Sequence, residues 1–486
     1  MKLKIIPLLL GLLLLTGVPE LGAGPLNVPH PGAETGSKIP GSFKLIGHNP
    51  LQNRGMNAAI AIHGNYAYIG SRTDGLHPNA ELKVVDISKP STPEIVGEIG
   101  MPNEGNIGET SRELRVWPEK NLLIVLNLAS NCSYLIHVCS PTSAVGDDNF
   151  RFYDISKKNA QSPKLVSEYE PSVDPHEFYL WDDPKKKGRA LLFMSTPGGG
   201  GTQLMVTDIS DAAKGKFTEM GKWTTVIPDQ EADRRLHSLT VSNDGKRGYL
   251  AYLGGGFFIV DTSEFAKGVK EPKVKQVTPI PNRVHWGNPG VHSAVKLLGR
   301  DWAMTTDEVY GEIPGLLSEH GCPWGWVRFI DISNPKKPKI ASEYRLAANR
   351  EEFCDDPTAN SPDRNSLSSW SAHNPTVVNK IALLTWHSAG LQAIDTSNPR
   401  KPKQLAYYRP EPLAFVTQED PLLSSGQDKV VMWSFPIIKD GLIYVVDVRN
   451  GLYILKYQGP YEKEIARIDF LEGNSNLGDA LRLEKP

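Results

Sequence analysis

The chain has 486 residues, and its 53 lysines and arginines nearly balance its 55 aspartates and glutamates, which gives a net charge of −2. A near-neutral chain with scattered basic residues lacks the concentrated positive charge of nucleic-acid-binding proteins, which argues against nucleic acid as a partner. The length suffices for several small domains or for one large repeat fold with a continuous core.

The first residues have the layout of a secretory signal peptide. Two lysines precede an apolar run from Ile5 to Leu15, and small residues follow up to Ala23. This layout predicts a signal peptide over residues 1–23 and a mature protein that is secreted, periplasmic or at the cell surface. The rest of the sequence has no second apolar run long enough to span a bilayer, so we expect no membrane span in the mature chain. Residues 24–41 are interpreted as a linker.

One pattern recurs along the rest of the chain: an apolar strand ending in Asp, Ile or Thr, and Ser, followed by a Pro-rich turn and another strand. LKVVDISKPSTPEIVGE and RFIDISNPKKPKIASEY are complete copies. In this setting an aspartate side chain bonds the backbone of the turn that follows, so a structural role is predicted for these aspartates. The repeated positions are Asp86, Asp154, Asp208, Asp261, Asp331 and Asp395, with Lys456 in a degenerate seventh copy.

Each repeat contains four strand signals, which are β-branched and aromatic runs bounded by turn residues. Four strands in a unit of about 50 to 70 residues match one blade of a propeller, in which each sheet packs on its neighbours and ring closure protects the edges. The sequence therefore predicts an all-β fold, a seven-bladed β-propeller with four-stranded blades over residues 42–457. Residues 458–486 are interpreted as a C-terminal tail.

A separate strand signal precedes the first complete repeat. Residues Ser42 to His48, SFKLIGH, resemble the outer-strand copies PEIVGE and PKLVSE, whereas the last repeat ends near Tyr457 without such a strand. We therefore expect the N-terminal segment to complete the last blade as its outermost strand. Both ends of the chain would then join in one sheet and close the ring.

Four cysteines in a chain expected to be exported indicate disulfides and an oxidising compartment. Three pairings are possible, and the simplest joins Cys132 to Cys139 and Cys322 to Cys354. The alternative is four unpaired, buried thiols.

Histidine recurs at the start of the predicted innermost strand in blades three to six, in HEFYLW, HSLTVS, HSAVKL and HNPTVV. In a propeller the innermost strands begin at one end of the central channel, so side chains at this position are expected to ring its mouth. The position holds His176, His237, His292 and His373 in these four blades, and Asn57, Arg112 and Ser434 in blades one, two and seven.

Imidazole is the commonest metal ligand in proteins, so the four histidines predict a site for one transition metal ion, copper, iron or zinc. The second strand of each blade returns to the same end, which would place Asp307, Glu308 and His387 near the ring as binding residues. Two alternatives stay open. The histidines are structural and bond backbone carbonyls, copied by duplication, or they line a metal-free pocket for a polar ligand.

The units VVDIS and FIDISNPKKPKIASEY, with NYAYIG before the first of them, resemble the LVIVD repeats of exported bacterial and archaeal proteins. The resemblance covers about residues 42 to 457. It implies a β-propeller at or outside the cell surface, in a family mostly without an assigned reaction. Lys456 in place of the repeated aspartate, and long insertions in blades two and five, depart from the family pattern.

Two functions are compatible with these features. The first is a recognition scaffold that binds an extracellular protein, a glycan or a small molecule through the face that carries the histidines and the long, cysteine-containing loops. The alternative is a metal-dependent oxidoreductase with copper or iron on the four histidines, an arrangement similar in geometry, but not in sequence, to the carotenoid oxygenases. The protein is expected to be a monomer, and no catalytic residue is assigned.

Overall fold

The computed structural model describes residues 39–73, 77–100, 110–128, 148–196, 201–227, 235–287, 290–308, 323–355, 369–420, 423–424 and 428–484. The predicted signal peptide lies outside these residues, as do Cys132, Cys139 and Cys322. Secretion and both disulfide pairings therefore stay predictions.

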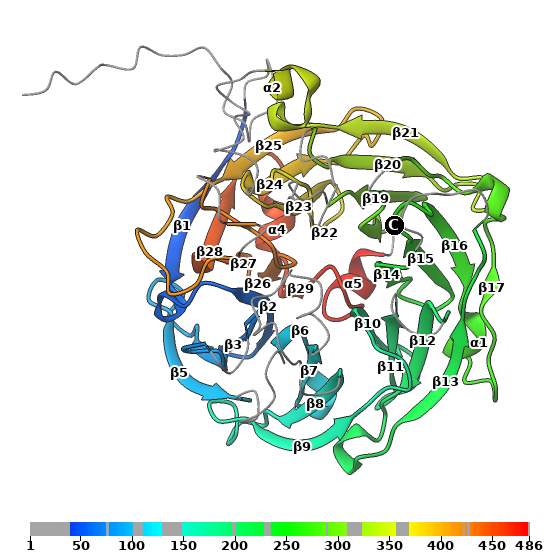
Figure 1. The fold of residues 1–486 in the computed structure, drawn as a ribbon, viewed down its shortest axis with the longest axis horizontal. Helices are drawn as coiled ribbons and strands as arrows, with labels where there is room; N and C mark the ends of the chain where they lie inside the picture. Colours follow the sequence, from blue (N-terminus) through cyan, green and yellow to red (C-terminus); the bar gives the residue numbers. More distant parts are fainter. Residues whose placement is uncertain are drawn as a thin grey trace, which may run out of the picture.

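Seven antiparallel sheets surround a central axis, and in each repeat the first strand lies innermost and the fourth outermost (Figure 1). The predicted all-β, seven-bladed propeller is thus confirmed. Blades 1 to 3 consist of β2 (Asn57–His63), β3 (Tyr66–Ser71), β4 (Leu82–Asp86) and β5 (Glu94–Ile99); β6 (Thr110–Trp117), β7 (Leu122–Leu128), β8 (Asn149–Asp154) and β9 (Lys164–Tyr169); and β10 (Glu177–Asp182), β11 (Ala190–Ser195), β12 (Leu204–Asp208) and β13 (Thr218–Trp223).

The remaining four blades continue around the ring in chain order. Blades 4 to 7 consist of β14 (Ser238–Val241), β15 (Arg247–Ala251), β16 (Phe257–Asp261) and β17 (Lys275–Gln276); β18 (Ser293–Lys296), β19 (Trp302–Thr306), β20 (Val327–Asp331) and β21 (Lys339–Tyr344); β22 (Pro375–Val377), β23 (Ile381–Trp386), β24 (Gly390–Asp395) and β25 (Lys403–Tyr408); and β26 (Ile437–Lys439), β27 (Leu442–Asp447), β28 (Gly451–Gln458) and β1 (Ser42–Asn49).

Burial along the strands explains why these runs of residues form blades. Strands β7 and β11 are buried at every position, because both of their faces pack against neighbouring blades. The outermost strand β5 alternates between exposed and half-buried residues, as expected for a sheet edge with one solvated face. The core is therefore continuous from blade to blade; between blades 3 and 4, for example, Phe193 and Val206 pack with Leu250 and Phe258.

The repeated aspartates end the third strand of the first six blades. In each, the carboxylate oxygen accepts a hydrogen bond from the backbone N–H of the serine two residues later, at 2.7 to 3.1 Å. Their predicted structural role in the turn is confirmed.

Strand β1 pairs antiparallel with β28 over Ser42 to Asn49, as the sequence predicts. The ring is therefore closed by hydrogen bonds between strands from opposite ends of the chain. Phe43 packs on Tyr457 with ring centroids 5.5 Å apart, and His48 stacks on Tyr453 at 4.3 Å.

Deleting Ser42–Asn49 is expected to leave the edge of β28 unpaired, because unpaired strand edges lose ladder hydrogen bonds and pair with other chains. We expect the melting temperature to fall by roughly 5 °C or more, with self-association. Thermal unfolding and size-exclusion chromatography measure both effects, and a chain that lacks only residues 24–38 is the control. An unchanged melting temperature with monomeric elution of the deletion variant would contradict this closure.

The C-terminal segment, residues 459–484, folds against one end of the channel (Figure 1). Its short strand β29 (Phe470–Leu471) extends the sheet of blade 7 by pairing with β26. Contacts with three further blades join the Asn476 side chain to the backbone of Asp182 (2.7 and 2.8 Å), the Asn243 side chain to Ala480 O (2.8 Å), and Lys296 to Glu484 (2.6 Å).

Helices are few and short in the described part of the chain: α1 (Ser263–Ala266), α2 (Glu351–Asp355), α4 (Glu462–Ala466) and α5 (Ala480–Leu483). Within this part, none of them is long and apolar enough to cross a membrane.

Candidate metal centre at the channel mouth

The four predicted histidines occupy equivalent positions at the start of the inner strands of blades 3 to 6. Each backbone N–H donates to a carbonyl near the end of the second strand of its own blade. The four bonds are His176 to Ser195 (2.8 Å), His237 to Ala251 (2.9 Å), His292 to Thr306 (2.8 Å) and His373 to Thr385 (2.9 Å).

Three of the histidine carbonyls are also held by a hydroxyl of the preceding blade. Ser195 donates to His237 O at 2.7 Å, Ser238 to His292 O at 2.6 Å, and Thr306 to His373 O at 2.6 Å. The spacing between these histidines is therefore set by the packing of one blade on the next.

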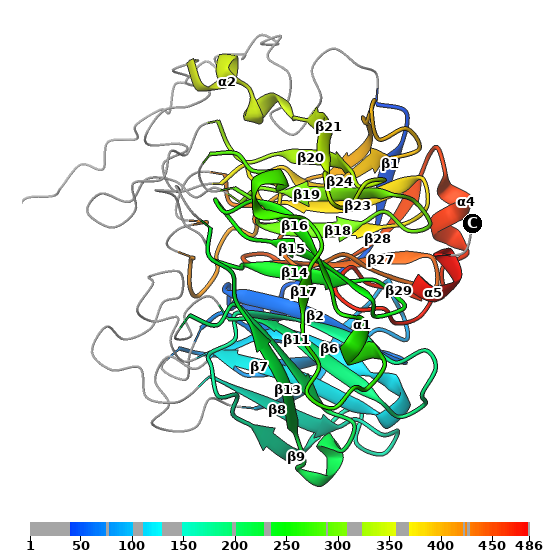
Figure 2. The ribbon, with the colours of Figure 1, turned by 90° about the vertical axis from the view of Figure 1, so that its right-hand side faces the viewer.

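The histidines lie at the end of the channel opposite to the C-terminal segment. Strands β10, β14 and β18 each follow a histidine and run toward Asp182, Asn243 and Lys296, where that segment makes its contacts. Helices α4 and α5 accordingly lie on one side of the molecule in Figure 2. Between the two ends, a cavity of about 10 Å³ lies beside Glu177 and Asn474, at the lower limit for one water molecule.

The imidazole rings form a continuous row around the channel. Ring centroids are 4.5 Å apart for His176 and His237, 4.1 Å for His237 and His292, and 4.5 Å for His292 and His373. His387, which follows β23, extends the row at 4.9 Å from His373. The structure thus brings together all four histidines of the predicted ring and adds the fifth that the sequence had placed near it.

Glu308 lies among three of these imidazoles. Its carboxylate oxygens are 3.0 Å from His292 Nε2, 3.3 Å from His373 Nε2 and 3.1 Å from His387 Nε2. All four side chains are at least 95 % buried. These short distances do not correspond to aligned hydrogen bonds: among the described residues, His292 Nε2, His387 Nε2 and Glu308 Oε1 have no hydrogen-bond partner.

The other ring nitrogen of each of these three histidines, Nδ1, has a polar partner. His373 Nδ1 donates to the carbonyl of Trp433 at 2.7 Å, and Nδ1 of His292 and of His387 lies 2.9 Å from the hydroxyls of Ser293 and Ser369. A bond from Nδ1–H to a carbonyl leaves the lone pair of Nε2 turned toward Glu308. Metal-binding histidines are commonly held in this way by a second partner.

Burial and mutual contact decide the charges of this cluster. Burial lowers the pKa of His373 and of His237 well below the usual 6.5, and the neighbouring His292 lowers both further. Burial alone would raise the pKa of Glu308, but its contacts with His373 and His292 outweigh burial and hold it well below the usual range. Glu308 therefore favours its ionised form and His373 its neutral form, the forms in which a carboxylate and an imidazole coordinate metals.

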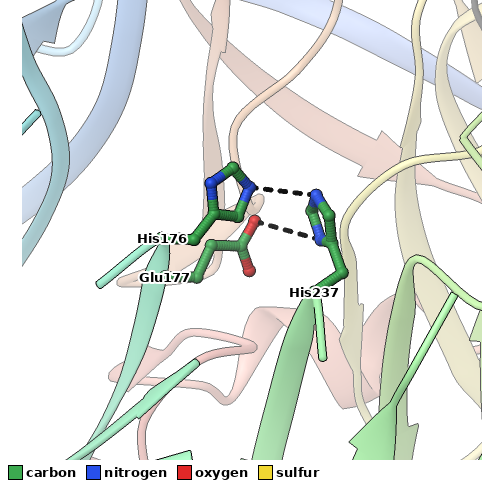
Figure 3. A group of neighbouring side chains, drawn as sticks. All are labelled: His176, Glu177 and His237. Atoms are coloured by element: carbon green, nitrogen blue, oxygen red, sulfur yellow. Dashed lines mark hydrogen bonds and ion pairs between the residues drawn. The ribbon is translucent and has the colours of Figure 1, made fainter. Parts of the chain in front are cut away.

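The other end of the row has a different chemistry (Figure 3). His176 Nε2 lies 3.4 Å from Arg112 Nη2 and 3.0 Å from His237 Nε2. Because arginine only donates, His176 Nε2 is an acceptor in this arrangement. His237 Nδ1 faces Glu177 Oε1 at 3.9 Å. Burial, and then the nearby Glu113, raise the pKa of Glu177 well above its usual range.

Three residues that the sequence placed near the ring contact the protein framework instead. Asn57 accepts from Arg54 Nε at 2.6 Å and donates to Val448 O at 3.1 Å, and Ser434 Oγ accepts from the backbone N–H of Val446 at 2.9 Å. Asp307 pairs with Arg328 and accepts from Trp286 Nε1 at 3.1 Å. Burial, opposed by Arg328, raises the pKa of Asp307 to about 7.

Sequence reasoning missed two neighbours of the ring. Trp433, which precedes the blade-7 position, lies 5.1 Å from the His373 ring and supplies the carbonyl that holds it. Ser369, in the connection before blade 6, holds His387. Trp433 directly precedes Ser434, the ring position of blade 7, and this was the only weak indication of its place. No repeated pattern in the sequence marks Ser369.

Fold and site define a β-propeller with a histidine- and glutamate-lined channel mouth. A family model for the LVIVD repeat matches residues 54–99, which include all of blade 1. The chain is therefore a β-propeller that contains an LVIVD repeat. No curated protein matches it.

The solved structures similar to this chain share little sequence with it. They include Sqt1 from Chaetomium thermophilum (12 % identity, TM-score 0.46, 84 % of this chain and 86 % of that chain), Sqt1 bound to the N-terminus of ribosomal protein L10 (12 %, 0.45, 84 % and 89 %) and the C-terminal WD40 domain of Sif2 (8 %, 0.47, 87 % and 100 %).

Proposed function

We propose that this protein is a metal-dependent binding protein whose ligand site is the channel mouth on the histidine side. The observation that carries the proposal is the position of Glu308, within 3.0 to 3.3 Å of three buried imidazole nitrogens, two of which, in His292 and His387, have no hydrogen-bond partner among the described residues. We assign the metal ion to Glu308, His373 and His387, whose ligand atoms all lie within 4.8 Å of one another.

Two features of the geometry support a cation between these atoms. Ligand atoms about 2.0 to 2.2 Å from one ion lie about 2.8 to 3.5 Å from one another, and the distances from Glu308 Oε1 to Nε2 of His373 and of His387, 3.3 and 3.1 Å, fall in this range. The His373 lone pair and a carboxylate oxygen repel each other when nothing separates them. A bound cation replaces this repulsion with two coordinate bonds.

The assigned ligands differ from the four-histidine set that the sequence predicts. His176 Nε2 is engaged by Arg112 and by His237, which disfavours coordination at that nitrogen. His292 contacts the other carboxylate oxygen of Glu308 and is grouped with His237, so Glu308, His373 and His387 form the assigned set. Two imidazoles and one carboxylate suit copper, iron or zinc, and three protein ligands leave a coordination position open for a further ligand.

A recognition role fits the surroundings of the site. The cavity between the ring and the C-terminal segment measures only about 10 Å³, so a ligand would approach from the mouth. Long chain connections leave from the same end, after Leu128 and after Thr306. Connections on a rigid scaffold are where binding sites are usually built. Proteins, glycans and small molecules all remain candidate ligands.

Metal analysis of protein purified without chelator or nickel resin tests the proposal. We expect close to one equivalent of copper, iron or zinc at neutral pH, before or after reconstitution. Since burial holds the pKa of His373 below the usual 6.5, protons should displace the ion only below about pH 6. Less than about a tenth of an equivalent of every metal after reconstitution would contradict the proposal and leave the histidines as structural groups. Turnover of substrates in a broad redox screen would instead favour the oxidoreductase alternative.

A further inference from the structure

The two carboxylate oxygens of Glu308 face different histidines. Oε1 lies near His373 and His387, whereas Oε2 lies 3.0 Å from Nε2 of His292. His237, His292 and Glu308 offer ligand atoms that all lie within 4.8 Å of one another, as Glu308, His373 and His387 do. The carboxylate therefore belongs to two groups of ligands that share no histidine.

A chain of hydrogen bonds fixes which nitrogen of a neutral His292 carries the proton. Asn374 donates its amide N–H to Trp433 O at 3.1 Å, so its Oδ1 accepts from Ser293 Oγ, also at 3.1 Å. Since the Ser293 hydroxyl donates its one proton to Asn374, it accepts from His292 Nδ1–H at 2.9 Å. The lone pair of His292 is therefore on Nε2, which faces Glu308 Oε2 and has no hydrogen-bond partner among the described residues.

His237 supplies a further nitrogen beside this pair. Its ring centroid lies 4.1 Å from that of His292. His237 is also grouped with His176 and Glu177 (Figure 3), but there the carboxylate oxygen is 3.9 Å from the nearest nitrogen of His237, and His176 Nε2 already has polar partners. The shorter separation between His292 and Glu308 favours their group as the place for an ion.

We propose that the Glu308 carboxylate bridges two metal ions. The first is the ion of the proposed function on Oε1, and the second lies on Oε2, with His292 and His237 as its other ligands. This inference rests on the proposed function and adds a second ion to the site. The lone pairs of His292 Nε2 and Glu308 Oε2 repel each other at 3.0 Å, and a cation between them replaces the repulsion with two coordinate bonds. Imidazole and carboxylate ligands suit copper, iron or zinc here as well.

The second ion is expected to bind at least about tenfold more weakly than the first. Ions in two-metal sites lie about 3.5 to 4 Å apart, and two divalent cations at this distance repel each other. The single negative charge of one shared carboxylate offsets this repulsion only in part. The first equivalent should therefore fill before the second, which needs a higher concentration of free metal.

Equilibrium dialysis against rising concentrations of copper(II), followed by elemental analysis and electron paramagnetic resonance, tests the bridge. We expect wild type to bind one equivalent and then a second. The second equivalent should weaken the signal of the first instead of doubling it, because two copper(II) ions about 4 Å apart couple magnetically. Copper bound elsewhere on the surface would add an uncoupled signal of full intensity.

His292→Ala and His237→Ala are each expected to keep the first equivalent, with an uncoupled signal, and to bind the second at least about a hundredfold more weakly. The retained ion, together with circular dichroism, checks that each variant is folded. His176→Ala is the matched control and should bind both equivalents.

Three results would overturn the bridge alone: a wild type that stops at one equivalent, a second equivalent with an uncoupled signal, or a second ion that is lost in His176→Ala and kept in His292→Ala. A wild-type protein that binds no copper, iron or zinc would overturn the bridge together with the proposed function.

Discussion

Replacing Glu308 with glutamine is expected to lower the affinity for the metal ion at least about a hundredfold, since even outer-sphere partners of metal sites commonly contribute ten- to a hundredfold. Glutamine keeps the shape of the side chain but removes the anionic oxygens that lie 3.0 to 3.3 Å from three imidazole nitrogens. Competition with a chromophoric chelator measures the affinity of the purified variant.

Glu177→Gln is the matched control. It is the same substitution, made two blades away from Glu308. Burial and Glu113 keep the pKa of Glu177 well above its usual range, so glutamine resembles its neutral form and the metal affinity should change less than about threefold. His387→Ala should lose the ion and His176→Ala should keep it. The reverse result for this pair would show that the ion sits on the four-histidine ring and not on Glu308.

Truncation after Gln458 is expected to lower the melting temperature by at least about 10 °C or to prevent soluble expression. The removed segment buries five large apolar side chains, and each contributes about 1.5 to 3 kcal/mol before the entropy of ordering is subtracted. These are Ile465, Ile468, Leu471, Leu477 and Leu483.

A point variant separates the packing of this segment from its polar contacts. Asn476→Ala removes the bonds to Asp182 and should reduce the free energy of unfolding by only about 1 to 3 kcal/mol. Thermal unfolding of the truncated chain within about 2 °C of wild type would mean that the propeller is stable without its C-terminal segment, and the burial argument would fail.

Repetition explains why so much of the architecture was predictable. Six Asp-x-Ser turns and a degenerate seventh copy at Lys456 indicated seven blades, and the unmatched strand SFKLIGH indicated the closure. The four histidines could be recognised as equivalent because each one stands at the start of the innermost strand of its blade. Glu308 and His387 were placed near the ring by the return of the second strand, but their contacts depend on side-chain directions that no sequence period specifies.

Features outside the repeat were harder to predict. The C-terminal segment has no copy elsewhere in the chain, so its packing across blades 3, 4, 5 and 7 had no template. We do not assign His176 to the proposed metal site because Arg112 contacts its Nε2, and Arg112 lies beside it because blade 2 is next to blade 3 in the ring. Asn57 and Ser434 hold the same ring position but are engaged by the backbone of blade 7.

The three assigned ligands come from two neighbouring blades: Glu308 from blade 5, and His373 and His387 from blade 6. A bound ion would therefore join these two blades across a single interface. Its affinity would depend on their separation, which the bond from Thr306 to the His373 carbonyl helps to fix. A partner that contacted both blades and drew them together would strengthen metal binding, and by thermodynamic reciprocity the ion would strengthen the binding of that partner by the same factor.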